Sequence, residues 1–145
     1  MPDPAIALDE LRRRLAAEFP EAFHAESSLC IVRIEHRMAQ VRYAFRPKSL
    51  RPGGTISGPT MMILADTAMY VAVLASIGWA PLAVTTNLSI NFLKKPGPRA
   101  LDAECRLLKL GKRLAVGEIS IRSKGEEELA AHAVSTYSIP SSRPG

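Results

Sequence analysis

Cysteine and histidine are scarce in this chain of 145 residues. The two cysteines, Cys30 and Cys105, lie far apart in strand-like segments, a spacing that gives neither a disulfide framework nor a metal knuckle. We interpret both as core thiols of a protein in a reducing compartment. The three histidines, His24, His36 and His132, show neither metal-ligand spacing nor a partner nucleophile, so we interpret them as structural or surface residues and expect no metal.

Aromatic residues make up only 6% of the chain and do not alternate with basic residues, as they do where bases stack. Nucleic acid is therefore not an expected partner, although the net charge is +5. A phosphorylated small ligand and an ordinary solvated basic surface both remain as explanations of that charge.

Targeting and nucleophile-elbow signals are also missing. The start, Met1-Pro2-Asp3-Pro4, lacks a basic segment followed by an apolar one, so a cytoplasmic protein is expected. No Gly-x-Ser-x-Gly motif is present, which leaves a serine hydrolase unsupported. The length suits one domain, residues 1–145, with a genuine core.

Asp66 stands alone in a long apolar run, residues 61–75. A carboxylate in such a run must be desolvated, paired or protonated, and acids in apolar surroundings often serve catalysis. The alternative is a purely structural buried acid that forms hydrogen bonds with Thr67, Ser57 or an opposing backbone amide. The run is long enough to span a membrane, but Asp66 near its start and amphipathic strands on both sides favour a helix wrapped by a sheet.

The apolar run begins with helix-start signals. Ser57 can cap a helix, Pro59 suits its first turn, and Gly58 allows close approach of another molecule. We expect a central helical segment 58–78, stopped at Gly78 and buried on all sides.

Periodicity predicts one helix before this segment and strands on both sides of it. An N-terminal helical segment, 1–20, has its apolar residues between 6 and 19 near one face and ends at Pro20. Period-two alternation predicts six strands, at 28–36, 38–46, 82–93, 100–110, 114–122 and 127–139. Residues 47–54 read as a loop, and a bulge is expected around Gly117. This order predicts an α+β fold, a curved antiparallel sheet wrapped around one long central helix.

In the predicted strand 82–93, strict alternation places Leu82, Val84, Thr86, Leu88, Ile90 and Phe92 on one face. Thr85 and Asn87 fall on the opposite face.

The segment Gly58-Pro59-Thr60-Met61-Met62-Ile63-Leu64-Ala65-Asp66-Thr67-Ala68 resembles the hotdog-fold acyl-CoA thioesterases, in particular the PaaI-like branch of the 4HBT superfamily. Segments 87–94 and 110–115 support the resemblance, which covers about residues 29–137. It implies a hotdog fold, hydrolysis of an acyl-CoA, and no cofactor beyond the coenzyme A of the substrate. By this resemblance, Asp66 takes the position of the catalytic carboxylate, and the backbone N–H of Gly58 polarises the thioester carbonyl. Thr85 places a hydroxyl near the reacting group.

The chain departs from the family pattern at three positions. Ser57 replaces a histidine, Pro59 replaces a second glycine, and Arg51 stands where an asparagine or glutamine is common. Tyr70 is the polar residue one turn beyond the acid. The resemblance places Ser57, Pro59, Tyr70 and Asn87 among the substrate-binding residues.

The spacing of Gly58 and Asp66 predicts a dimer independently of the family. Eight residues along one helix separate them by about 12 Å, too far for both to meet one reacting carbonyl. Two antiparallel copies of the helix can bring them together, so an obligate two-fold homodimer is expected. The resemblance implies the same and leaves a dimer of dimers open.

Cations at two turns could bind the phosphates of coenzyme A: Lys94, Lys95, Arg99, Lys109, Lys112 and Arg113. A solvated surface explains any one of them equally well. The residues Met61, Met62, Met69 and Tyr70 suggest an adaptable apolar pocket.

Three functions remain open. The first is a thioesterase for a medium-chain or aromatic acyl-CoA, with Asp66 as general base or as nucleophile. The second is a hotdog hydratase or dehydratase, which generally needs a histidine near the central helix, and none lies between His36 and His132. The third is a non-catalytic acyl-CoA binding protein, suggested by the changes at Ser57 and Pro59.

Overall fold

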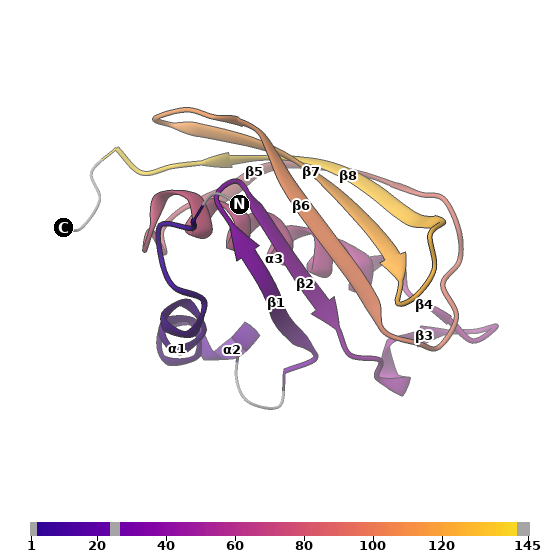
Figure 1. Cartoon of the computed structure of the whole chain (residues 1–145). Coiled ribbons are helices and arrows are strands. Elements are labelled where there is room, and N and C mark those ends of the chain that lie inside the picture. Colours follow the sequence, from indigo (N-terminus) through magenta and orange to yellow (C-terminus); the bar gives the residue numbers. More distant parts are fainter. Residues whose placement is uncertain (1–2, 24–26, 142–145) are drawn as a thin grey trace.

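A curved antiparallel sheet holds one long helix against its concave face (Figure 1). The computed structural model describes residues 3–23 and 27–141. The strands of the sheet are β1 Leu29–Glu35, β2 Met38–Tyr43, β5 Val84–Phe92, β6 Leu101–Leu110, β7 Leu114–Ser123 and β8 Leu129–Ser138. The helices are α1 Leu8–Glu18, α2 Pro20–Phe23 and α3 Gly58–Ile77. A 3₁₀ turn, η1 Pro47–Ser49, and the short strands β3 Leu50–Arg51 and β4 Thr55–Ile56 precede α3.

The strand order is β1-β2-β6-β7-β8-β5, with every neighbouring pair antiparallel. The predicted α+β arrangement and its six long strands are confirmed. The predicted loop at 47–54 is wrong in detail, because η1 and the β3–β4 hairpin form there. The order leaves β1 and β5 as the two edges of the sheet, and β5 has an open side for hydrogen bonding.

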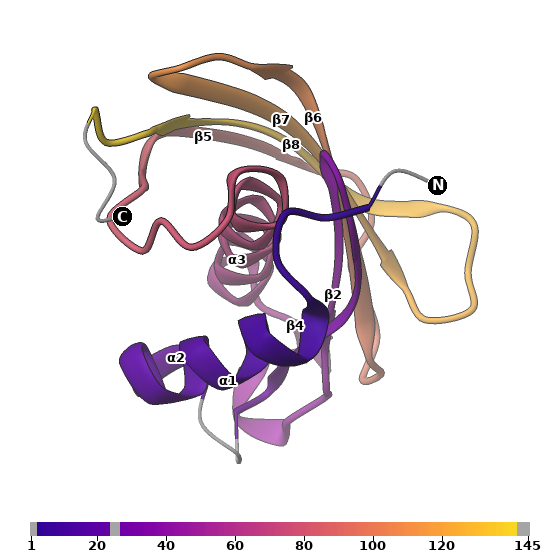
Figure 2. The ribbon, with the colours of Figure 1, turned by 60° about the vertical axis from the view of Figure 1, so that its left-hand side comes forward.

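The sheet covers only part of α3. Figure 2 shows α3 nearly end-on inside the curl of the sheet, with α1 and α2 lying to one side of it. Every residue from Ala68 to Ser76 is buried. In the first half of α3, however, Met62 is 41% and Ile63 60% exposed, and Asp66 is only half-buried. The prediction of a helix buried on all sides is therefore wrong for this half, because the sheet ends at the edge strand β5.

Length and composition alone would allow α3 to cross a membrane, since its mean hydropathy reaches 1.7. Within the fold, however, 67% of that apolar window is buried. Packing of the sheet against the helix therefore accounts for its apolar character.

The two cysteines have different surroundings. Cys105 is fully buried on β6, as predicted, and burial raises the pKa of its thiol to about 12. Cys30 is exposed, so its assignment to the core is wrong. On edge strand β1 the inward positions are Ile31 and Ile34, and Cys30 points to the other face.

Gly117 on β7 lies close against α3. A Cβ atom on Gly117 would lie 2.5 Å from Met69 Sδ and 3.1 Å from Cys105 Sγ. The bulge expected near this residue is present on the neighbouring strand, where the pairing shifts between Leu107 and Lys109. Glycine at position 117 thus allows α3 to pack closely against the sheet.

We expect Gly117→Ala to destabilise the protein by about 1–3 kcal/mol, because the added methyl group overpacks the contact with Met69. Chemical unfolding measures the difference. Gly97→Ala is the matched control, since no atom lies within 4 Å of the position that its added methyl group would take, and its stability should stay close to that of the unchanged protein. Equal stabilities of the two variants would contradict this account of the helix–sheet contact.

Candidate active site

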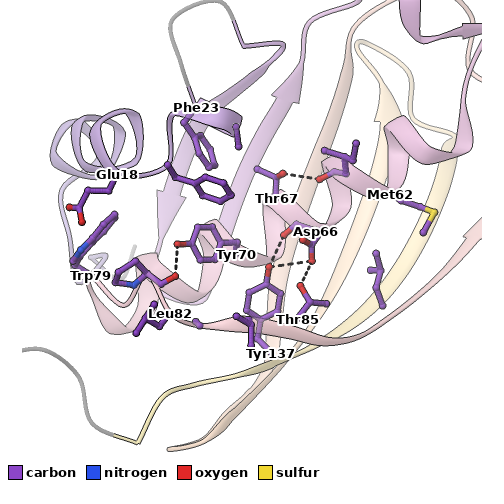
Figure 3. Close-up of a pocket in the computed structure, with 17 residues that line it drawn as sticks. Glu18, Phe23, Met62, Asp66, Thr67, Tyr70, Trp79, Leu82, Thr85 and Tyr137 are labelled. Atoms are coloured by element: carbon purple, nitrogen blue, oxygen red, sulfur yellow. Dashed lines mark hydrogen bonds between the residues drawn. The ribbon is translucent and has the colours of Figure 1, made fainter.

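Asp66 is held by two hydroxyl groups that reach it from the sheet (Figure 3). Thr85 Oγ1 on β5 donates to Asp66 Oδ1 at 2.5 Å, and Tyr137 Oη on β8 donates to the same oxygen at 3.2 Å. Tyr137 Oη also lies 3.3 Å from the Asp66 carbonyl oxygen. Both side-chain bonds fall on Oδ1, and no bond to Oδ2 comes from the part of the chain that the structure describes. The carboxylate is thus oriented through one oxygen, and the other is left open.

The alternative partners expected for Asp66 are engaged elsewhere. Thr67 Oγ1 donates to the Ile63 carbonyl oxygen at 2.8 Å, and Ser57 Oγ accepts from the Thr60 backbone N–H at 3.3 Å. The interpretation of Asp66 as an acid satisfied by Thr67 or Ser57 is therefore wrong.

A bulge in β5 aims Thr85 at the helix. Thr85 pairs with Tyr137 and Leu88 pairs with Ser135, while the register shifts between Thr85 and Asn87. Tyr137 and Ser135 are both buried on the inner face of β8, so the bulge brings Thr85 and Leu88 onto the same face. The strict alternation predicted for this strand is thus wrong, because it places Thr85 and Leu88 on opposite faces. The bulge turns Thr85 to the inner face, where its hydroxyl reaches Asp66.

Tyr137 is the site residue that sequence reasoning missed. Its side chain is 2% exposed, and burial raises the pKa of its hydroxyl well above the ordinary value, with the nearby Asp66 charge acting in the same direction. The hydroxyl therefore stays protonated and available as a donor. A usable signal existed, because a buried tyrosine generally finds a hydrogen-bond partner and strand 127–139 places Tyr137 on its apolar face.

Asp66 opens onto a largely apolar cavity of about 980 Å³. Aromatic rings form a continuous wall: Phe19 lies edge-on to Phe23 at 5.7 Å and to Tyr70 at 6.2 Å between centroids. Tyr70 in turn lies 6.2 Å from the Tyr137 ring beside the acid. The wall runs from the carboxylate to the short helices α1 and α2, so one end of the cavity is polar and the rest suits an apolar group.

Two of the four residues expected to line the pocket do so. Met62 and Tyr70 line the cavity, and Tyr70 Oη donates to the Pro81 carbonyl oxygen at 3.1 Å. Burial, and secondarily the charge of Glu18, raise the pKa of Tyr70. Met61 and Met69 pack instead in the core beneath the helix, and neither is a lining residue.

The start of α3 offers a single backbone donor. Ser57 caps the helix with its side chain, as predicted, and engages the N–H groups of Thr60 and Met61 through its Oγ and O atoms. Pro59 has no N–H group, which leaves that of Gly58. A Cβ atom on Gly58 would lie 3.3 Å from the Phe92 ring, so glycine allows Phe92 to pack closely against the start of the helix.

Within one chain Gly58 and Asp66 are not brought together. Gly58, Ser57 and Pro59 do not line the cavity that contains Asp66. Their separation along a continuous helix is the one expected from eight residues of spacing.

The cations predicted to bind phosphate are not gathered at the cavity. Lys94 Nζ pairs with Glu126 at 3.0 Å and with Glu128 at 3.7 Å. The hydrogen bond to Glu126 raises the pKa of Lys94. Lys112 and Arg113 lie in the turn between β6 and β7, at the opposite end of the ten-residue β6 from the Lys94 turn.

Asn87 is also separated from the cavity. It pairs with Thr136, which belongs to the outer face of β8, and it is not a lining residue.

No group of three potential metal ligands occurs within residues 3–23 and 27–141. His132 Nε2 lies 2.7 Å from Glu118 Oε1 on the outer face of the sheet, away from Asp66. His36 does not line the cavity either, and His24 falls outside the described residues.

Comparison with known proteins shows the family of this chain. The family model described as the thioesterase superfamily matches residues 53–130, more than half of the chain. A candidate thioesterase from a Silicibacter species is 41% identical, with a TM-score of 0.85 over 95% of this chain and 94% of that one.

Two structures at lower identity share the fold. The Escherichia coli PaaI protein of the phenylacetic acid degradation operon is 21% identical, with a TM-score of 0.75 over 96% of this chain and 97% of that one. A Streptococcus mutans protein bound to acetyl-CoA is 24% identical, with a TM-score of 0.70 over 83% of this chain and 95% of that one. These matches confirm the predicted resemblance to hotdog-fold, PaaI-like proteins. The chain therefore belongs to the thioesterase superfamily.

Proposed function

We propose that the protein hydrolyses an acyl-CoA thioester to a free acid and coenzyme A. The observation that carries the proposal is the carboxylate of Asp66, oriented through Oδ1 by Thr85 and Tyr137, with Oδ2 open at an apolar cavity. Acetyl-CoA bound to the Streptococcus mutans protein supports a CoA thioester as the ligand class. The aromatic wall suits a medium-chain or aromatic acyl group.

The reaction needs a nucleophile and a donor for the developing oxyanion. As a general base, Asp66 takes a proton from water, whose oxygen attacks the thioester carbonyl carbon. The tetrahedral intermediate then expels the thiolate, and the proton passes to the sulfur, giving the acid and the free thiol. As a nucleophile, Asp66 would instead form a mixed anhydride that water hydrolyses in a second step. Both routes use the same open oxygen.

The oxyanion donor in this proposal is the Gly58 N–H of a second copy of the chain. The positive end of the α3 dipole favours negative charge at this amide. Exposed apolar side chains support such pairing: Met62 and Ile63 on α3 line the same cavity as Val84 of the edge strand β5, and on that strand Val84 is 56% and Phe92 49% exposed. Apolar side chains along an unpaired strand edge favour association. We therefore propose a two-fold dimer, and association of two dimers remains an additional expectation.

A non-catalytic acyl-CoA binding protein is the second candidate. It is favoured by the start of α3, where Pro59 and the Ser57 cap leave one donor for an oxyanion. A hydratase is less well supported, because no histidine lines the cavity among the residues that the structure describes.

We expect Asp66→Asn to lower kcat about 10²–10⁴-fold on acyl-CoA substrates, because the amide cannot take a proton or attack the carbonyl. A thiol reagent that reports released coenzyme A measures the rate over a panel of acyl groups. Binding of coenzyme A and the unfolding temperature should change little. Tight binding of intact acyl-CoA by the unchanged protein without any turnover would favour the binding protein instead.

We expect Thr85→Val to reduce kcat roughly tenfold with little change in KM, because it removes a hydrogen bond to a charged group while keeping the shape of the side chain. Thr85→Ser is the matched control, since it restores the hydroxyl and should recover most of the rate. If Thr85→Val keeps its activity while Thr85→Ser loses it, packing of the methyl group and not the hydroxyl matters at this position.

A mixing experiment tests whether Asp66 and Gly58 come from different chains. Gly58→Pro removes the N–H, and Ser57 already has the extended backbone that proline requires before it, with φ −71° and ψ 153°. Asp66→Ala and Gly58→Pro should each be nearly inactive. In a mixed dimer of the two, one site receives both intact groups, so equal mixing should restore about a quarter of the unchanged activity.

Re-association after denaturation and joint refolding of the two variants provides the mixed dimers, and each variant refolded alone provides the control. Absence of any recovery, with mixed dimers demonstrated by differential tagging, would show that both groups act within one chain.

A further inference from the structure

A second cavity of about 540 Å³ lies beside the one that contains Asp66. It is bounded by α2, by the end of β2, by η1 and by the first turn of α3. Figure 2 shows α1 and α2 on the same side of α3 as the chain around residues 47–56. Its polar lining residues include Ser27, Ser28, Arg46, Lys48, Ser49 and Thr60. The lining is thus rich in hydroxyls and carries two cations, in contrast to the aromatic wall of the first cavity.

The two cavities are neighbours. Ala22 and Ile63 line both of them, and Ile63 lies one helical turn before Asp66. Thr60, in the second cavity, precedes Asp66 by six residues, about 9 Å along the helix. A ligand whose reactive group lies at Asp66 can therefore extend past Ile63 into the second cavity.

The cations of this cavity are free to meet an anion. Arg46 and Lys48 are exposed and form no ion pair with any other residue in 3–23 and 27–141. Glu21 is the one acid that lines the cavity within those residues. Lys94, which the sequence suggested for this role, already neutralises Glu126 and Glu128.

The turn that carries the two cations is held in place by hydrogen bonds. The Arg46 backbone N–H donates to Tyr43 Oη at 3.0 Å, and Ser49 Oγ donates to the Arg46 carbonyl oxygen at 2.7 Å. Tyr43 Oη and Ser49 Oγ also bond to each other. Pro47 further restricts the backbone at the start of η1. The backbone positions of Arg46 and Lys48 are fixed before a ligand arrives, so binding loses less conformational entropy.

We propose that this second cavity binds the phosphates of the coenzyme A moiety, through Arg46 and Lys48, while the acyl group occupies the first cavity. The inference rests on the proposed function for the identity of the ligand. Phosphate oxygens suit a guanidinium and an ammonium group, and nearby hydroxyls such as that of Ser28 can complete the hydrogen bonding. The pantetheine arm then crosses the boundary at Ile63 and Ala22.

The double variant Arg46→Ala, Lys48→Ala tests the proposal with two substrates that share an acyl group. We expect kcat/KM for the acyl-CoA to fall roughly tenfold or more, since charge-assisted bonds to phosphate are lost. Turnover of the corresponding acyl-pantetheine, which lacks the nucleotide, should stay unchanged. Arg13→Ala, Lys124→Ala is the matched control, because it removes the same charge from two exposed positions elsewhere.

Calorimetric titration with free coenzyme A decides the site without relying on catalysis. We expect the Arg46, Lys48 variant to bind coenzyme A at least about tenfold more weakly, with a shallower dependence on salt. Unchanged binding, no binding by the unchanged protein, or an equal loss with acyl-pantetheine would overturn the inference.

A loss confined instead to Lys112→Ala, Arg113→Ala would place the phosphates at the β6–β7 turn and would also overturn it. If the unchanged protein hydrolyses neither thioester, the proposed function fails, and the coenzyme A titration still decides where the phosphates bind.

Discussion

The site depends on one interaction, the pair of hydroxyl groups from the sheet that meet a single oxygen of Asp66. A carboxylate on an otherwise apolar helix requires polar partners, and the helix itself does not provide them here. Thr85 and Tyr137 reach it from adjacent strands, β5 and β8. The same contacts therefore fix the acid, join the helix to the edge of the sheet and leave one carboxylate oxygen facing the cavity.

A second constraint is the incomplete cover that the sheet gives to α3. The last half of the helix is buried, whereas the first half leaves Met62, Ile63 and part of Asp66 accessible. Both cavities border this uncovered strip, and Ile63 belongs to each of them. The proposed partner chain and the proposed substrate thus use one continuous surface, so that assembly and chemistry are physically linked in this interpretation.

Much of the fold could be predicted from local patterns. The six long strands and the central helix follow from period-two alternation and from the apolar run that Asp66 interrupts. Asp66 itself was recognisable because a lone charge in such a run is costly.

Tyr137 was not recognisable in the same way, since it lies 71 residues from Asp66 and only the pairing of β5 with β8 brings them together. Thr85 follows from the family resemblance, but strict alternation puts it on the opposite face from Leu88, whereas the bulge brings both to the inner face. The density of cations in the sequence does not reveal that Lys94 is neutralised by Glu126.

The bulge between Thr85 and Asn87 has a consequence for how this chain can vary. One extra residue, Thr86, whose hydroxyl donates to the Thr136 carbonyl oxygen at 3.2 Å, shifts the strand by half a pleat. A regular strand that kept Thr86 without the bulge would place Thr86 opposite Tyr137 and turn the Thr85 hydroxyl toward solvent. The register of this strand therefore matters as much for the orientation of Asp66 as the identity of the residue at position 85.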